Sequence, residues 1–280
     1  MPVPDRIPAA GSVPASGAVV ALKSLYQAKS RLVGIADPLR RRLAWTMAAD
    51  TLESLVTVVH TVIVISDEPS LQGQLAAEGI DATVVPEASA GGMNTALEHG
   101  EQVLRRAGAE FVLACVADLP ALRPATVEAV LTAAAEHPRS FVADATGIGT
   151  TMLLARGVAL DPLFQGRSAA AHRASGAFAL GRPEIGEASD ARRDVDTVVD
   201  LYVASVLGLG PRTRRLIDPG TARLGTHQVI TTAGPGQVIT STGVRLPLPD
   251  AALPSWFAAL RPGQRLHAVL GEGQVLAAWL

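Results

Sequence analysis

The feature that most constrains this chain is the alternation of short apolar runs with longer amphipathic stretches. Residues 17–22 (GAVVAL), 61–66 (TVIVIS), 81–86, 110–117 and 140–145 have the length and composition of buried strands. Helices are expected near 69–79, 92–107 and 124–136, and Asp37-Pro38 starts another, whose apolar face carries Leu39, Leu43, Met47, Leu52 and Leu55. Strands and helices in this order predict an α/β fold, with a doubly wound, mostly parallel sheet covered by helices on both faces.

The pattern changes after Ile217. Residues 218–280 contain short strand-like runs separated by Gly-Pro-Gly and Pro-Gly turns, with one short helix expected around 250–260, which predicts a small β-barrel of the OB or cold-shock type. The segment contains the aromatic residues Trp256, Phe257 and Trp279. Trp256 and Phe257 lie in the expected helix and fit core packing better than base stacking, so nucleic-acid binding is the minority interpretation and dimerisation or covering of the main site is favoured. Residues 1–16 resemble a disordered lead-in, so the predicted division is 1–16, 17–217 and 218–280.

Composition limits the partners of the chain. Apolar residues make up 48% of its 280 residues, charged residues 18%, and the net charge is −2, so no basic field attracts nucleic acid or an anionic membrane. The single cysteine, Cys115, excludes an intramolecular disulfide and a multi-cysteine zinc site, and its position inside an apolar run indicates a core thiol. No apolar run approaches the roughly 18 residues of a membrane helix. A soluble, cytoplasmic protein is expected.

Acidic residues occur where ligands of such a fold bind, at the carboxyl edge of the sheet. Asp118 ends the apolar run 110–117 and is followed by Leu119-Pro120, and a second acidic cluster contains Asp194 and Asp196. Mg²⁺ prefers a few carboxylates completed by water and phosphate oxygens, so Asp118 with one acid of the pair would suit it. Two alternatives remain, since Asp118 could start a helix and Asp196-Thr197 could cap one.

Three further groups of residues indicate phosphate chemistry. Lys23, Lys29 and Arg31 follow the first strand, where cations would neutralise a triphosphate, although a solvated basic loop has the same composition and no Walker motif is present. Gly91 and Gly92 allow close approach of a ligand. Asn94 suits a purine edge or a ribose hydroxyl, or is a helix cap.

The third group lies between residues 144 and 177. Thr150 follows a small-residue loop, and Gly166 and Ser168 lead into a helix start that would bind an anion. Together with the magnesium acids, two anion sites imply two phosphorylated substrates. His172, one helical turn after Ser168, either orients an acceptor or is a structural histidine.

Six short segments occur in a fixed order along the chain: AKSRL, GGMNTAL, ADLPALRP, SFVADATGIGTTML, SAAAHR and DVDT. In this order they resemble the 2-phospholactate/phosphoenolpyruvate guanylyltransferases of deazaflavin coenzyme F-420 biosynthesis. The resemblance covers residues 17–215 and implies the nucleotidyltransferase variant of the doubly wound fold, with the barrel as an extension found in some members. Two positions depart from the family: Ala21 replaces a usual proline, and a Phe-Gly segment reads Phe164-Gln165-Gly166.

The resemblance implies that the enzyme joins GMP from GTP to phosphoenolpyruvate or 2-phospholactate and releases pyrophosphate. It implies Mg²⁺ on Asp118 and on Asp194 or Asp196, with Lys23, Lys29 and Arg31 at the nucleotide, and it further implies a phospho-acid held by Thr150, Gly166 and Ser168. A homodimer and transfer of the product to a following enzyme are expected.

The sequence leaves two alternatives to this function open. The first is a nucleotidyltransferase for 3-phosphoglycerate or a sugar phosphate, although the Gly-rich loop usual for sugar phosphates is missing after residues 20–22. The second is a non-catalytic, nucleotide-responsive module that acts through the barrel.

Overall fold

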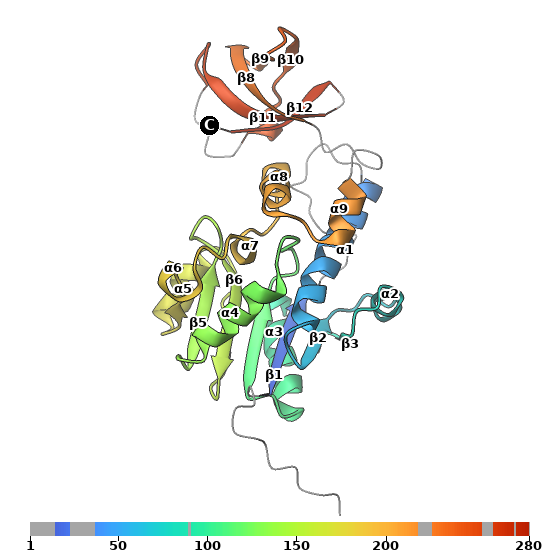
Figure 1. The fold of residues 1–280 in the computed structure, drawn as a ribbon, viewed down its shortest axis with the longest axis vertical. Coiled ribbons are helices and arrows are strands. Elements are labelled where there is room, and N and C mark those ends of the chain that lie inside the picture. The colour runs from blue at the N-terminus through green and yellow to red at the C-terminus, as the bar shows by residue number, and fades with distance from the viewer. Residues whose placement is uncertain are drawn as a thin grey trace, which may run out of the picture.

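The structure is a computed structural model that describes residues 15–22, 37–88, 91–217, 226–253, 260–271 and 273–279. Its main body is a seven-stranded sheet of order β3-β2-β1-β4-β6-β5-β7 (Figure 1). The strands are β1 (Ser16–Ala21), β2 (Thr61–Ile65), β3 (Thr83–Val85), β4 (Phe111–Cys115), β5 (Arg139–Ala143), β6 (Thr150–Arg156) and β7 (Phe178–Ala179). All neighbouring pairs are parallel except β4–β6 and β5–β6, where β6 runs antiparallel. The predicted doubly wound, mostly parallel sheet is confirmed.

Helices cover both faces of this sheet because successive strand residues point to opposite sides. Within β1, Val19 packs against the helix α3 (Gly92–Arg106), whereas its neighbours Ala18 and Val20 pack toward α1 (Asp37–Val56) and α4 (Pro124–Ala134). The remaining helices are α2 (Leu71–Ala77), α5 (Ser168–Ala174), α6 (Arg182–Ile185), α7 (Ser189–Arg192), α8 (Val198–Leu207) and α9 (Pro211–Ile217). The apolar face expected for α1 is buried at Leu43, Met47, Leu52 and Leu55.

Cys115 lies in the core, as expected from its apolar run. Its side chain is fully buried in β4, and burial raises the pKa of the thiol, with the nearby Asp118 carboxylate adding to the effect. None of the helices in the described residues combines the length and apolar character needed to cross a bilayer.

A second, five-stranded antiparallel sheet follows, with the order β10-β9-β8-β11-β12. Its elements are β8 (Thr226–Gly234), β9 (Gln237–Ile239), β10 (Arg245–Pro247), the 3₁₀ turn η1 (Asp250–Ala252), β11 (Arg265–Gly271) and β12 (Gln274–Trp279). The sheet curls into a half-barrel around Ile230, Val238 and Leu266. Of the helix expected at 250–260, the described residues include only η1, and Trp256 and Phe257 lie outside them. The OB type and the domain limits stay predictions.

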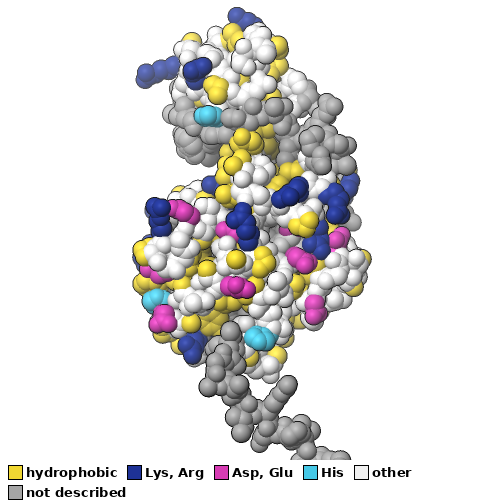
Figure 2. Space-filling model, in the orientation of Figure 1, with side chains coloured by type: hydrophobic (Ala, Val, Ile, Leu, Met, Phe, Trp, Pro, Cys, Tyr) yellow, Lys and Arg dark blue, Asp and Glu magenta, His cyan; other side chains and the backbone are white. Residues whose placement is uncertain are grey.

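Helix α8 lies between the half-barrel and the main sheet (Figure 1). The cross-strand pair Val269–Ala277 of β11 and β12 shares one apolar cluster with Val198 and Leu201 of α8. Figure 2 shows hydrophobic side chains gathered at this neck. The half-barrel therefore packs on the helix that directly follows the acidic pair Asp194 and Asp196.

Candidate active site

The turn that carries Asp118 is held by α1. The hydroxyl of Thr51 accepts a hydrogen bond from the Leu119 amide at 3.0 Å and lies 3.3 Å from the Ala117 carbonyl oxygen. Leu119 is fully buried beside it. Asp118 does not start a helix, because α4 begins only at Pro124, with Arg123 as its N-cap. The backbone on both sides of this carboxylate is therefore fixed at the carboxyl edge of β4.

The segment 194–196 lies directly against this turn. The amide of Val195 donates to the Asp118 carbonyl oxygen at 3.0 Å, and the Val195 side chain is fully buried in the cluster beneath α8. Asp194 and Asp196 flank this buried residue, and each of them is only partly buried. The N-cap of α8 is Thr197, which accepts from the Asp200 amide, so Asp196 is not the cap.

Carboxylates accumulate around Asp194. Its pKa is raised to about 7, first by burial and then by the negative charges of Asp118, Asp196, Asp144 and Asp200. Each of these charges opposes ionisation of Asp194. A cation placed among them would relieve this repulsion and favour the ionised form.

The donor set fits a hard divalent cation that is only partly enclosed by protein. Carboxylate oxygens are the donors that Mg²⁺ selects. Across the described ranges, no three acidic, histidine or cysteine side chains are arranged to hold an ion on their own. A magnesium ion at Asp118 and the acidic pair would therefore take water and substrate phosphate oxygens as its remaining ligands. Assignment of Asp118, Asp194 and Asp196 as ligands stays a prediction.

The loop before Thr150 is organised by Asp144. One carboxylate oxygen of Asp144 accepts from the amides of Thr146 and Ile148 at 3.0 Å, and the other accepts from the Gly149 amide at 2.8 Å. A Cβ on Gly149 would lie 2.5 Å from this carboxylate, so only glycine fits without displacing it. Because β6 runs antiparallel, its first residue, Thr150, lies at the same edge as the ends of β4 and β5.

His172 is a structural neighbour of Thr150. Its Nε2 accepts from the Leu163 amide at 2.9 Å, so the proton is on Nδ1, which lies 2.9 Å from the Thr150 hydroxyl. The side chain is fully buried, and burial lowers its pKa to about 4, with the charge of Arg139 acting in the same direction. His172 is therefore a neutral, structural histidine whose two ring nitrogens both have partners. Through Nδ1 it orients the Thr150 hydroxyl.

Gly166 and Ser168 lie on the connection into α5. Gly166 adopts a φ of +55°, a conformation that side chains disfavour, and Ser168 is buried at the first position of the helix. The Ala169 amide, one of the helix-start donors, is already engaged by the Ile148 carbonyl oxygen. The loop 144–150 and the start of α5 are therefore joined, and a phosphate bound by Ser168 would lie beside both.

On the nucleotide side, Gly91 is the N-cap of α3 and Gly92 has a φ of +81°. A Cβ on Gly91 would lie 2.3 Å from the Thr95 hydroxyl oxygen, so both glycines are required by the turn itself. Asn94 does not cap the helix. Its side-chain oxygen accepts from the Phe164 amide at 2.8 Å. The predicted contacts of these residues with a nucleotide stay predictions, and Lys23, Lys29 and Arg31 lie outside the described residues.

Two supporting residues were missed by reasoning from the sequence. Thr51 holds the Asp118 turn, and Arg192 donates from its guanidinium to the carbonyl oxygens of Ala143 and Leu180. Thr51 and Leu119 are 68 residues apart, and Arg192 and Ala143 are 49 apart, so no local pattern indicates these contacts.

Known proteins resemble this chain over most of its length. A family model for the MobA-like NTP transferase domain matches residues 38–181. A phosphoenolpyruvate guanylyltransferase of Salinispora arenicola is 46% identical over 210 residues, which covers 73% of this chain and 93% of the relative. One of the same name from Streptomyces avermitilis is 46% identical over 211 residues, with 72% and 95% covered. Roughly a quarter of this chain lies outside each of these two matches.

Among solved structures, a candidate nucleotide-diphospho-sugar transferase from Desulfovibrio desulfuricans superposes with a TM-score of 0.55 at 16% identity, covering 76% of this chain and 94% of that one. At this identity the likeness concerns the fold alone. The matched domain and the relatives point to one conclusion. The chain belongs to the MobA-like NTP transferase family and, within it, to the phosphoenolpyruvate guanylyltransferases.

Proposed function

We propose that this nucleotidyltransferase transfers GMP from GTP to phosphoenolpyruvate, giving enolpyruvyl-diphospho-guanosine and pyrophosphate, in the biosynthesis of coenzyme F-420. One observation carries the catalytic part of the proposal: the hydrogen bond from the Val195 amide to the Asp118 carbonyl oxygen joins the acidic pair to the acid at the end of β4. The relatives' shared name supports the substrates. The cytoplasm is the proposed location.

The reaction needs no covalent intermediate. A phosphate oxygen of the acceptor attacks the α-phosphorus of GTP, and the bond from that phosphorus to the bridging oxygen of pyrophosphate breaks. Catalysis then consists of in-line positioning and neutralisation of charge. Mg²⁺, when bound at Asp118 and the acidic pair, would supply the positive charge that offsets the phosphates.

The chain's own residues would position the two substrates. Gly91 and Gly92 let the backbone approach the nucleotide, while Lys23, Lys29 and Arg31 would neutralise the triphosphate. Thr150, held by the neutral His172, and Ser168 would donate hydroxyl hydrogen bonds to the acceptor phosphate, with Gly166 allowing close approach. A homodimer and delivery of the product to a following enzyme complete the proposal.

The decisive experiment measures pyrophosphate release from each of the four ribonucleoside triphosphates paired with phosphoenolpyruvate, 2-phospholactate or 3-phosphoglycerate. We expect release that depends on GTP, on phosphoenolpyruvate and on added Mg²⁺. Release with another acceptor and none with phosphoenolpyruvate would refute the proposed substrate. Absence of release from every pair, together with salt-sensitive binding of single-stranded RNA in a filter assay, would instead favour a non-catalytic module.

A further inference from the structure

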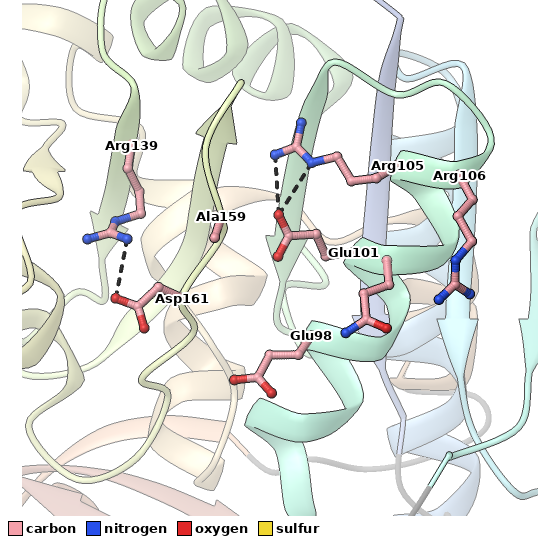
Figure 3. Close-up of a pocket in the computed structure, with 8 residues that line it drawn as sticks. Glu98, Glu101, Arg105, Arg106, Arg139, Ala159 and Asp161 are labelled. Atoms are coloured by element: carbon pink, nitrogen blue, oxygen red, sulfur yellow. Dashed lines mark hydrogen bonds and ion pairs between the residues drawn. The ribbon is translucent and has the colours of Figure 1, made fainter.

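The connection between β6 and α5 carries Gly166 of the proposed acceptor site, and α3 holds it from one side. The Leu160 amide donates to both carboxylate oxygens of Glu101 at 3.0 Å, and Arg105 donates to the Val158 carbonyl oxygen at 2.7 Å. Figure 3 shows this part of α3, with Glu101 and Arg105 turned toward one another opposite Ala159 and Asp161. The C-terminal half of α3 therefore fixes the start of the connection.

Asn94, in the first turn of the same helix, fixes its other end. The Asn94 side-chain oxygen accepts from the Phe164 amide at 2.8 Å, and the preceding amide, of Leu163, donates to Nε2 of His172. The Phe164 ring packs edge-on against the His172 ring, with centroids 5.1 Å apart. Two consecutive amides are thus held from two helices, immediately before Gly166 and Ser168.

We propose that Asn94 is a positioning residue for the acceptor: its side-chain oxygen holds residues 163–168 in the conformation that binds the phospho-acid. The inference rests on the proposed function for the identity of the acceptor. Asn94 lies two residues after Gly92, so the same helix start carries the proposed nucleotide contact and the anchor of the acceptor segment. Loss of this anchor weakens acceptor binding more than nucleotide binding.

Kinetics test this directly. Losing one hydrogen bond that holds a loop costs about a fivefold to tenfold loss of affinity. We expect Asn94→Ala to raise KM for phosphoenolpyruvate by about that factor and KM for GTP by less. Glu98→Ala, which changes an exposed side chain one turn along the same helix, is the matched control and should leave both values unchanged. An increase in KM for GTP alone would overturn the proposal.

Amide hydrogen exchange tests the anchor without any substrate. In Asn94→Ala, exchange at the Phe164 amide, followed by NMR, should accelerate about fivefold or more. Asn94→Asp keeps an oxygen acceptor at the same place and should restore protection, whereas the exchange rate in Glu98→Ala should equal that of the wild type. Unchanged exchange in Asn94→Ala would refute the anchor. If the wild-type protein released no pyrophosphate from GTP and phosphoenolpyruvate, the proposed function would be refuted. The exchange rate at the Phe164 amide would still show whether Asn94 anchors residues 163–168.

Discussion

Lowering the pH should destabilise the protein through His172. The pKa of this histidine falls from 6.5 to about 4 on folding, because the ring is buried with its Nε2 engaged by the Leu163 amide. Between these two pKa values the unfolded chain binds a proton at this histidine and the folded chain does not. The stabilisation present above pH 6.5 is therefore lost as the pH falls toward 4. Between pH 7.5 and 4.5 these two pKa values correspond to a loss of about 2.5 kcal/mol.

The quantity to measure is the difference in the free energy of unfolding between the wild type and His172→Gln. His172→Gln keeps an amide oxygen for the Leu163 amide and an NH₂ group for Thr150, but it does not titrate. Urea unfolding at pH 7.5, 6, 5 and 4.5 gives the free energy of unfolding of each protein. Folding raises the pKa of Asp194 to about 7, so the stabilisation that this carboxyl contributes is lost as the pH rises. Because both proteins contain Asp194, this contribution cancels when one free energy of unfolding is subtracted from the other.

We expect the wild-type advantage over His172→Gln to shrink by about 2.5 kcal/mol between pH 7.5 and 4.5. A difference that stays constant within about 0.5 kcal/mol over this range would show that His172 is not held neutral by burial. A difference that grows as the pH falls would mean that the folded state stabilises the charged ring, which contradicts the hydrogen bonds assigned to Nδ1 and Nε2.

Three further changes test the site. Asp118→Asn should abolish pyrophosphate release while leaving the circular dichroism spectrum unchanged, because the Val195 amide bonds the backbone oxygen of residue 118; wild-type rates with Mg²⁺ would show that this carboxylate is not a metal ligand. Val195→Ala should lower the free energy of unfolding by about 2 kcal/mol in urea denaturation, since the side chain is fully buried, and an unchanged midpoint would contradict this packing. Gly149→Ala should raise KM for the acceptor, because the new Cβ would lie 2.5 Å from Asp144; unchanged kinetics would mean that this loop does not shape the acceptor site.

The parts predictable from the sequence are those encoded by local periodicity. Several predicted elements agree with the structure to within a few residues at each end. They are the strands at 17–22, 61–66 and 110–117 and the helices near 92–107 and 124–136. β-branched runs and the proline at the first position of α4 act within a few residues of chain, so one sequence suffices to detect them. The position of Asp118 at the carboxyl edge follows from the same reasoning.

The direction of β6 was not predictable, although it decides where Thr150 lies. A strand of seven residues such as Thr150–Arg156 pairs equally well in either direction, and only the tight connection from β5, closed by Asp144, reverses the chain. The role of Asn94 was likewise inaccessible. Local reasoning offered a helix cap or a nucleotide contact, whereas its partner, Phe164, is 70 residues away.

The sequence by itself thus determined the α/β class, the second strand-rich unit and the residues able to carry phosphate chemistry. Tertiary structure alone decided which of these residues meet. The Val195 amide joins the acidic pair to the Asp118 turn, and burial makes His172 a neutral support for Thr150. The physical reason is the distance along the chain over which each effect acts. Propensity and periodicity act within a few residues of chain. Hydrogen bonds and burial at this site depend instead on how segments distant in the sequence pack across the sheet edge.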